Sequence, residues 1–166
     1  MSSDLMKQAA AFVLLVLAQV LVLGRIHLFD CATPLIYVYF VIRMARNYPK
    51  WALLLWAFVL GLVIDVLSNT PGLASASLTL IALVQPYYLE LYVPRDSADN
   101  LQPTLSALGP VKYTYYSAGL VLLYCLVFYS LEMFNLFNAL QWVLCIVGSA
   151  LLTMVLVITF EIAGRE

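Results

Sequence analysis

The sequence predicts an all-α membrane protein, a bundle of six transmembrane helices with both termini in the cytoplasm. Three observations support this prediction. Of the 166 residues, 64% are hydrophobic and only 10% are charged. Six apolar stretches fill most of the chain, and the basic residues fall almost wholly on alternate connections between them. A soluble domain carries about 25% charged residues, so this chain has too few polar side chains to cover a water-facing surface.

A single integral membrane domain is expected over residues 1–166, because the apolar stretches leave no room for a separate soluble domain. A helix of roughly 17–25 apolar residues crosses the hydrocarbon core of a bilayer. Helices are favoured over a β-barrel because runs such as Phe12–Leu17 do not alternate between apolar and polar residues. The expected helices lie at about 5–23, 31–42, 51–67, 73–93, 113–134 and 137–162.

The positions of the basic residues orient the predicted helices. If the N-terminus is cytoplasmic and each segment crosses once, only Arg25 lies outside. The other basic residues all lie on the cytoplasmic side: Lys7, Arg43, Arg46, Lys50, Arg95, Lys112 and Arg165. This distribution follows the positive-inside rule. The outer connections, at Gly24–Asp30, at Ser68–Gly72 and near Asn135, are short, so little of the chain is exposed outside.

The connection at residues 94–112 is the one sizeable cytoplasmic loop in this prediction. Leu101, Leu105 and Leu108 have helical spacing, which allows a short helix lying on the inner leaflet. A plain flexible loop is an equally good interpretation of this segment.

The second apolar segment, at residues 31–42, is unusually short. About twelve residues in a helix reach only about 18 Å, which is less than the thickness of the hydrocarbon core. Pro34 also interrupts its start. The segment either crosses with a broken or extended portion sheltered by neighbouring helices, or it is re-entrant. The even number of crossings implied by the basic residues favours crossing.

Ionisable side chains in apolar segments are candidate sites because burying them in lipid is costly. Asp65 follows Gly61 by one helical turn and precedes a cluster of turn-forming residues at Ser68–Gly72. We expect its carboxylate to accept hydrogen bonds from that turn or from backbone N–H groups at the start of the next helix. The remaining carboxylates of the segments are interpreted as solvated groups near the membrane faces: Glu90, Glu132 and Glu161.

Other polar and small residues indicate helix contacts. Gln85 and Pro86 interrupt the fourth segment, where Pro86 frees a backbone carbonyl; kinked packing and the lining of a small cavity are the two interpretations. Gln19 could form an interhelical hydrogen bond or face an interface. Small residues at four-residue spacing mark internal seams or a partner's docking face: Gly72, Ala76, Ser75, Thr79, Cys145, Ser149 and Thr153. They predict close packing of the third, fourth and sixth segments.

Catalysis finds no support in the sequence. His27 is the only histidine, and no motif of a nucleophilic or metal-dependent enzyme is present. We therefore expect no catalytic residue, no metal and no cofactor.

One stretch resembles a known family. Residues 58–68, followed by the Pro-Gly-Leu-Ala of residues 71–74, resemble the central signature of the rod shape-determining protein MreD family. That signature is a Gly-Leu-x-x-Asp run, a short turn and a glycine at the next helix. Three residues match it and a fourth is a looser match: Gly61, Asp65, Gly72 and Pro34. The resemblance implies that these residues shape the turn between the third and fourth helices.

The resemblance also implies a function. It implies a non-enzymatic protein of the bacterial inner membrane that works with MreC, the actin-like MreB filament, and RodA with its penicillin-binding transpeptidase. It implies a fold similar to the substrate-binding subunits of energy-coupling-factor transporters. The alternative is a vitamin-type small-molecule binding subunit of a transporter. Such subunits carry small residues at four-residue spacing in the first helix, whereas here Ala9, Ala10 and Ala11 are followed by larger residues.

Overall fold

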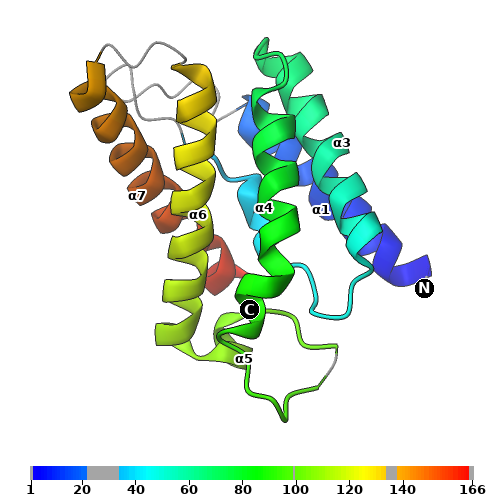
Figure 1. The fold of residues 1–166 in the computed structure, drawn as a ribbon. Helices are drawn as coiled ribbons and strands as arrows, with labels where there is room; N and C mark the ends of the chain where they lie inside the picture. Colours follow the sequence, from blue (N-terminus) through cyan, green and yellow to red (C-terminus); the bar gives the residue numbers. More distant parts are fainter. Residues whose placement is uncertain (1, 22–33, 99, 134–137, 165–166) are drawn as a thin grey trace.

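The structure, a computed structural model, describes residues 2–21, 34–98, 100–133 and 138–164. Every regular element in these ranges is a helix, as the apolar segments predicted (Figure 1). Five helices are long: α1 (Ser2–Leu21), α3 (Lys50–Ser68), α4 (Leu73–Glu90), α6 (Pro110–Glu132) and α7 (Ala139–Ala163). Two are short: α2 (Val38–Ile42) and α5 (Leu105–Leu108).

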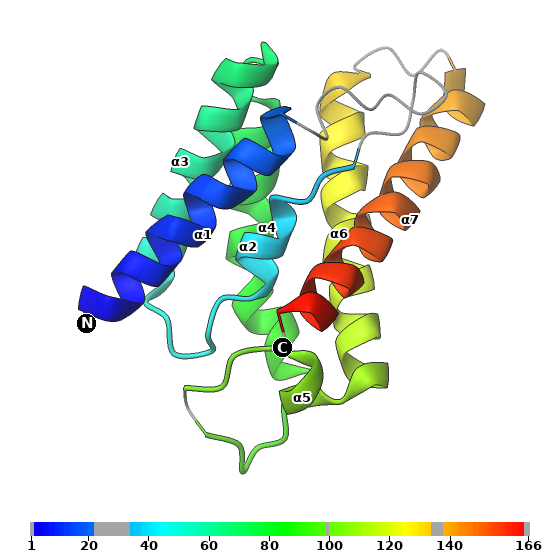
Figure 2. The same cartoon turned by 180° about the vertical axis from the view of Figure 1, so that it is seen from behind.

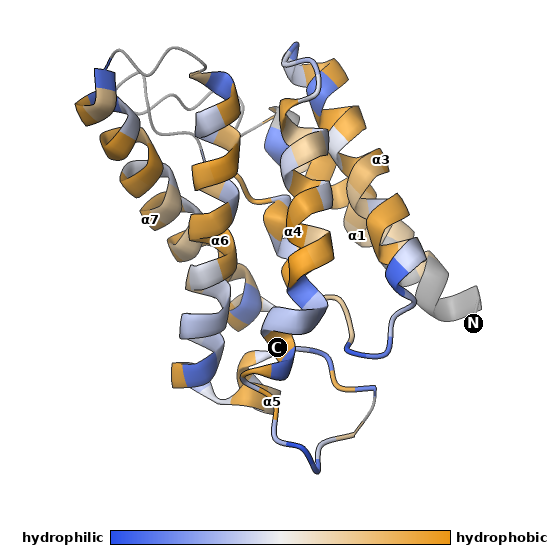
Figure 3. Cartoon of the chain, viewed as in Figure 1, coloured by the Kyte–Doolittle hydropathy of each residue, from blue (hydrophilic) through white to orange (hydrophobic). Residues whose placement is uncertain are grey.

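Three of these helices, α3, α6 and α7, are long and apolar enough to cross a membrane, and α1 holds a shorter apolar stretch at Ala9–Gln19. Many large apolar side chains of these helices are exposed, and Figure 3 shows that hydrophobic residues occupy much of each long helix. Leu62 on α3 and Leu144 and Leu151 on α7 are examples of exposed leucines. Because a water-soluble monomer rarely exposes large continuous apolar patches, this surface indicates a membrane protein.

The helices are arranged around α2, which lies at the centre of the bundle (Figure 2). The most extensive helix packing is between α3 and α4, followed by α6 with α7 and α4 with α6. The prediction that the third, fourth and sixth segments pack together is therefore correct only for α3 and α4. In the observed order α6 stands between α4 and α7, so α7 packs mainly on α6 (Figure 1).

The two ends of the bundle differ in charge. The loops after α2 and α4, and the first turns of α3 and α6, lie at the lower end in Figure 1. We call this the basic end, because these loops and first helical turns hold the basic residues Arg43, Arg46, Lys50, Arg95 and Lys112, and α1, which carries Lys7, also begins toward this end. The turn at residues 68–72 lies at the opposite end. The predicted outer connections at Gly24–Asp30 and near Asn135, with Arg25 and His27, lie outside the described residues, as does Arg165.

The predicted helix at residues 31–42 is much shorter than expected. Only Val38–Ile42 is helical, and residues 34–37 form an irregular turn, while residues 31–33 lie outside the described part of the chain. Pro34 has no N–H to donate and disfavours helical geometry in the residue before it. Residues 34–42 are all buried, so this broken segment is sheltered by the surrounding helices.

The cytoplasmic loop predicted at residues 94–112 contains one short helix, α5, which begins at Leu105. The hydroxyl of Thr104 caps it by accepting the N–H of Ala107 at 3.3 Å. Leu101 lies outside this helix, and its carbonyl accepts the N–H of Arg46 at 3.0 Å. Both interpretations of the loop are therefore partly correct, because a single helical turn sits within an otherwise irregular segment.

Candidate functional site

The Asp65 carboxylate joins α3 to the start of α4. Its Oδ1 accepts the backbone N–H of Ala74 at 2.8 Å and the hydroxyl of Thr70 at 3.1 Å, and its Oδ2 accepts the N–H of Ser75 at 2.9 Å. The side chain is only 5% exposed. The first N–H groups of a helix have no partner within it, and the helix dipole favours negative charge there. Asp65 thus caps α4 from the neighbouring helix.

Gly61 lies one turn before Asp65 and brings the two helices into contact. A Cβ built on Gly61 would lie 2.4 Å from Cα of Ser75 and 2.8 Å from the carbonyl carbon of Ala74. Real side chains do not approach backbone atoms this closely, so only glycine fits here. The close approach of the two backbones places the Asp65 carboxylate within reach of the α4 N–H groups.

The turn between these helices uses two left-handed residues. Asn69 has φ 56° and Gly72 has φ 82°. Glycine adopts this conformation without steric cost, and asparagine tolerates it better than most residues. The N–H of Thr70 also bonds the backbone carbonyl of Asp65 at 3.0 Å. Hydrogen bonds to Asp65 from both the turn and the next helix, which the sequence left as alternatives, are therefore both present.

The start of the broken segment is held by side chains of α1 and α7. The amide of Gln19 donates to the carbonyl of Pro34 at 2.9 Å and accepts the N–H of Ile36 at 3.2 Å. The hydroxyl of Thr153 accepts the N–H of Leu35 at 3.1 Å. Buried backbone groups require such partners where no helix supplies them. Gln19 therefore makes the interhelical contact that was one of its two interpretations.

The end of the broken segment is held by α4 and α6. Nε2 of Gln85 donates to the carbonyl of Met44 at 3.2 Å and to the hydroxyl of Tyr116 at 3.0 Å. The Tyr116 hydroxyl in turn donates to the carbonyl of Ile42 at 3.2 Å. Gln85 is 1% exposed, so its amide forms these hydrogen bonds inside the bundle. Pro86 follows it within α4 and is half-buried.

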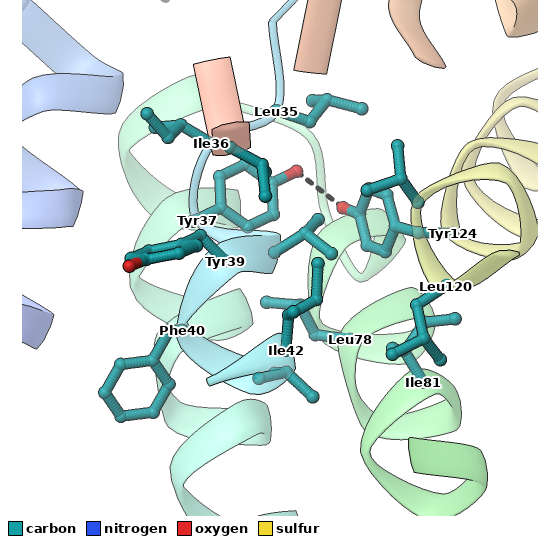
Figure 4. Packing of buried hydrophobic residues seen from close by; sticks show 14 of the residues in the cluster. Leu35, Ile36, Tyr37, Tyr39, Phe40, Ile42, Leu78, Ile81, Leu120 and Tyr124 are labelled. Carbon is teal, nitrogen blue, oxygen red and sulfur yellow. Dashed lines mark hydrogen bonds between the residues drawn. The ribbon is translucent and has the colours of Figure 1, made fainter. Parts of the chain in front are cut away.

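Between these two ends, the side chains of the broken segment fill the core (Figure 4). The hydroxyls of Tyr37 and Tyr124 point toward each other and lie 2.5 Å apart, with their rings edge to face. Ile36 and Ile42 are fully buried in the same cluster. The centre of the bundle is therefore filled by packed side chains around the broken segment.

Glu161 differs from its prediction as a solvated carboxylate. It is 7% exposed, and its Oε2 accepts the hydroxyl of Tyr39 at 2.6 Å while its Oε1 accepts the N–H of Leu105 at 3.3 Å. A carboxylate is tolerated in such a place when hydrogen bonds satisfy it. One signal was available in the sequence: Glu161 lies two four-residue steps beyond Thr153, on the face that small residues mark.

The small-residue positions have different environments. On α7, Cys145, Ser149 and Thr153 are all buried, and the hydroxyl of Ser149 bonds that of Tyr129 on α6. This face of α7 is an internal seam. On α4, Ala76 is exposed and the half-buried Thr79 bonds its own helix, at the carbonyl of Ser75.

Thr153→Val is expected to lower the free energy of unfolding by about 1–3 kcal/mol, because it leaves the buried N–H of Leu35 without an acceptor at nearly unchanged volume. Thr159→Val is the matched control, since that exposed hydroxyl bonds only the carbonyl of Val155 in its own helix. Thermal unfolding of both variants in detergent measures the difference. Equal midpoints for the two would contradict this role of Thr153.

Two tyrosines of α6 provide a second comparison. Tyr116→Phe removes a hydroxyl that links Gln85 to Ile42, and it is expected to cost about 1–3 kcal/mol. Tyr113→Phe is expected to be neutral or slightly stabilising, because the buried Tyr113 hydroxyl has no hydrogen-bond partner within the described residues. Denaturant titration measures the free energy of unfolding of both variants. A larger decrease for Tyr113→Phe than for Tyr116→Phe would contradict the role of the Tyr116 hydroxyl.

These contacts define a helical bundle of membrane-protein character, in which Gln19, Asp65, Gln85 and Thr153 bond backbone groups. Other buried hydroxyls pair with each other, as Tyr37 does with Tyr124. Within the described ranges, no group of three His, Cys, Asp or Glu side chains is placed to hold a metal ion. Comparisons with protein families, with curated proteins and with solved structures find no match to this chain.

Proposed function

We propose that this chain is a non-enzymatic, integral inner-membrane component of the bacterial rod complex, which scaffolds MreC and the peptidoglycan synthases to maintain cell shape. MreC is its direct partner in this proposal, with MreB, RodA and the penicillin-binding transpeptidase in the larger complex. The observation that carries the proposal is that Gly61, Asp65 and Gly72, which match the MreD signature, act together at the junction of α3 and α4. The resemblance to the MreD family implies that these residues shape the turn between the third and fourth helices.

In the proposed topology six segments cross the membrane: α1, the broken segment at residues 34–42, α3, α4, α6 and α7. The basic end lies in the cytoplasm, in keeping with the positive-inside rule. Non-helical backbone is tolerated at membrane depth when protein surrounds it, and residues 34–37 are buried in this way. We further propose a likeness to the substrate-binding subunits of energy-coupling-factor transporters.

A scaffold role agrees with how the side chains are used. The buried polar residues Gln19, Asp65, Gln85 and Thr153 each bond backbone within the bundle. The outward helix faces are apolar, and partner helices in a membrane associate through such faces by close packing. Under this proposal the interior keeps the shape of the bundle, while the outer faces of its helices meet other proteins.

The test combines cell shape with recovery of partners. Depletion of the chain in a rod-shaped host is expected to produce rounded cells, and the tagged chain is expected to co-purify with MreC. A photo-crosslinker at Ala76 on α4 or at Leu151 on α7, both exposed, then identifies the helix face that contacts MreC. Rod-shaped growth without the chain, together with no recovery of MreC, would overturn the proposal. A vitamin retained in native mass spectrometry would then favour the transporter alternative.

A further inference from the structure

A cavity of about 270 Å³ lies between α1, α2 and the loop that follows α4. Its apolar walls come from Ala11 and Leu15 of α1, from Phe40 of α2 and from Met44 of the loop that follows α2. Its polar lining includes Arg43 and Gln102, which come from the two loops at the basic end. The cavity therefore combines apolar walls with a cationic side chain, as a binding site for an anionic amphiphile requires.

The Arg43 side chain can still bind an anion. It is exposed, and its Nη1 donates to the hydroxyl of Tyr39 at 3.1 Å. The nearby carboxylate of Glu161 is instead bonded by Tyr39 and by the N–H of Leu105. A guanidinium carries more N–H donors than this single bond uses, and two of them together match a phosphate.

The surroundings favour an anionic ligand. Outside α1, the described residues at this end include five basic residues and three acidic ones, at Glu90, Asp96 and Glu161, and α1 adds one of each, Lys7 and Asp4. Basic pockets between helices on the cytoplasmic side of membrane proteins bind anionic lipid headgroups. A volume of about 270 Å³ is below the range of about 300–1,000 Å³ typical of pockets that enclose a drug-sized ligand, so it fits a headgroup and not a whole lipid.

We propose that this cavity binds the headgroup of an anionic phospholipid of the inner leaflet, with Arg43 bonding the phosphate and the apolar walls contacting the upper acyl chains. The inference uses the membrane orientation of the proposed function and none of its partners. Lipid binding is measured on the purified chain, so a failure here is distinguishable from a failure of the scaffold role, which cell shape and MreC recovery report.

The experiment is native mass spectrometry of the delipidated full chain after titration with phosphatidylglycerol, phosphatidylethanolamine or inorganic phosphate. The wild-type chain is expected to retain one phosphatidylglycerol in preference to phosphatidylethanolamine. Arg43→Gln is expected to weaken this binding about tenfold, the effect of losing one charge-assisted hydrogen bond. Lys112→Gln is the matched control, because Lys112 lies at the same end on α6 and does not line the cavity.

A second variant, Ala11→Leu, narrows the cavity from an exposed position of α1 and is also expected to reduce retention without lowering the melting temperature. If Arg43→Gln folds poorly, the retention of lipid by Ala11→Leu still tests the proposal. Three results would overturn the proposal. The first is equal retention of phosphatidylglycerol and phosphatidylethanolamine by the wild-type chain. The second is an equal loss of phosphatidylglycerol binding in Arg43→Gln and Lys112→Gln. The third is that inorganic phosphate alone raises the melting temperature as much as phosphatidylglycerol does.

Discussion

Gly61→Leu is expected to separate α3 from α4 and to lower the free energy of unfolding by about 3 kcal/mol, the upper end of the usual cost of overpacking. The reason is the contact at this position, where even a Cβ would lie 2.4 Å from Cα of Ser75. Backbone atoms cannot rotate away as a side chain can, so the helices themselves must move. A loss of this size is a large part of the marginal stability of a domain.

The measurement is thermal unfolding in detergent, supported by the yield of monodisperse protein on size-exclusion chromatography. Ala76→Leu is the matched control, because it adds a leucine of the same size to an exposed position of α4 beside Ser75. The control is expected to behave as the wild-type chain does. A Gly61→Leu variant that unfolds at the wild-type temperature would show that the two backbones do not touch.

Asp65→Ala is expected to cost about 3 kcal/mol, because two charge-assisted hydrogen bonds to the start of α4 are lost, each contributing about 1.5–3 kcal/mol. The N–H groups of Ala74 and Ser75 are then left without the acceptor they have in the folded chain. Asp65→Asn is expected to be intermediate, since its amide oxygen can accept one of these N–H groups while its NH₂ faces the other.

The control for Asp65 is Asp96→Ala, which removes an exposed carboxylate from a loop and is expected to change the unfolding midpoint very little. Hydrogen exchange at the first turn of α4 adds a local readout, with faster exchange expected in Asp65→Ala alone. Equal exchange in the two variants would count against the cap. Under the proposed function, recovery of MreC with Asp65→Ala falls only as far as the folded fraction falls.

The parts of the fold that depend on local sequence were predictable. The third helix was expected at 51–67 and is observed at Lys50–Ser68, because a long apolar run ends at an evident turn. The hydrogen bonds of Asp65 were predictable for a similar reason. The turn and the start of the next helix lie within ten residues of it, and their N–H groups need an acceptor.

The contacts made over long sequence distances were not predictable from the chain alone. Glu161 was interpreted as a solvated carboxylate because its partners, Tyr39 and Leu105, are brought to it only by packing of α2 and α5. Gln19 had two open interpretations, because its partner, the carbonyl of Pro34, is brought to it only by the packing of the broken segment against α1. The packing of α7 on α6 likewise depends on the order of helices in space, which small residues on one face do not encode.

The direct test of the membrane orientation uses cysteine labelling in intact cells. Ser68→Cys lies at the end of α3, opposite the basic end, and Ser106→Cys lies in α5 at the basic end, and both positions are exposed. Each is made with Cys31→Ser, so that the other thiols are the buried Cys125 and Cys145. A membrane-impermeant maleimide is expected to label Ser68→Cys in intact cells and Ser106→Cys only after the membrane is opened. Labelling of Ser106→Cys in intact cells would contradict the account.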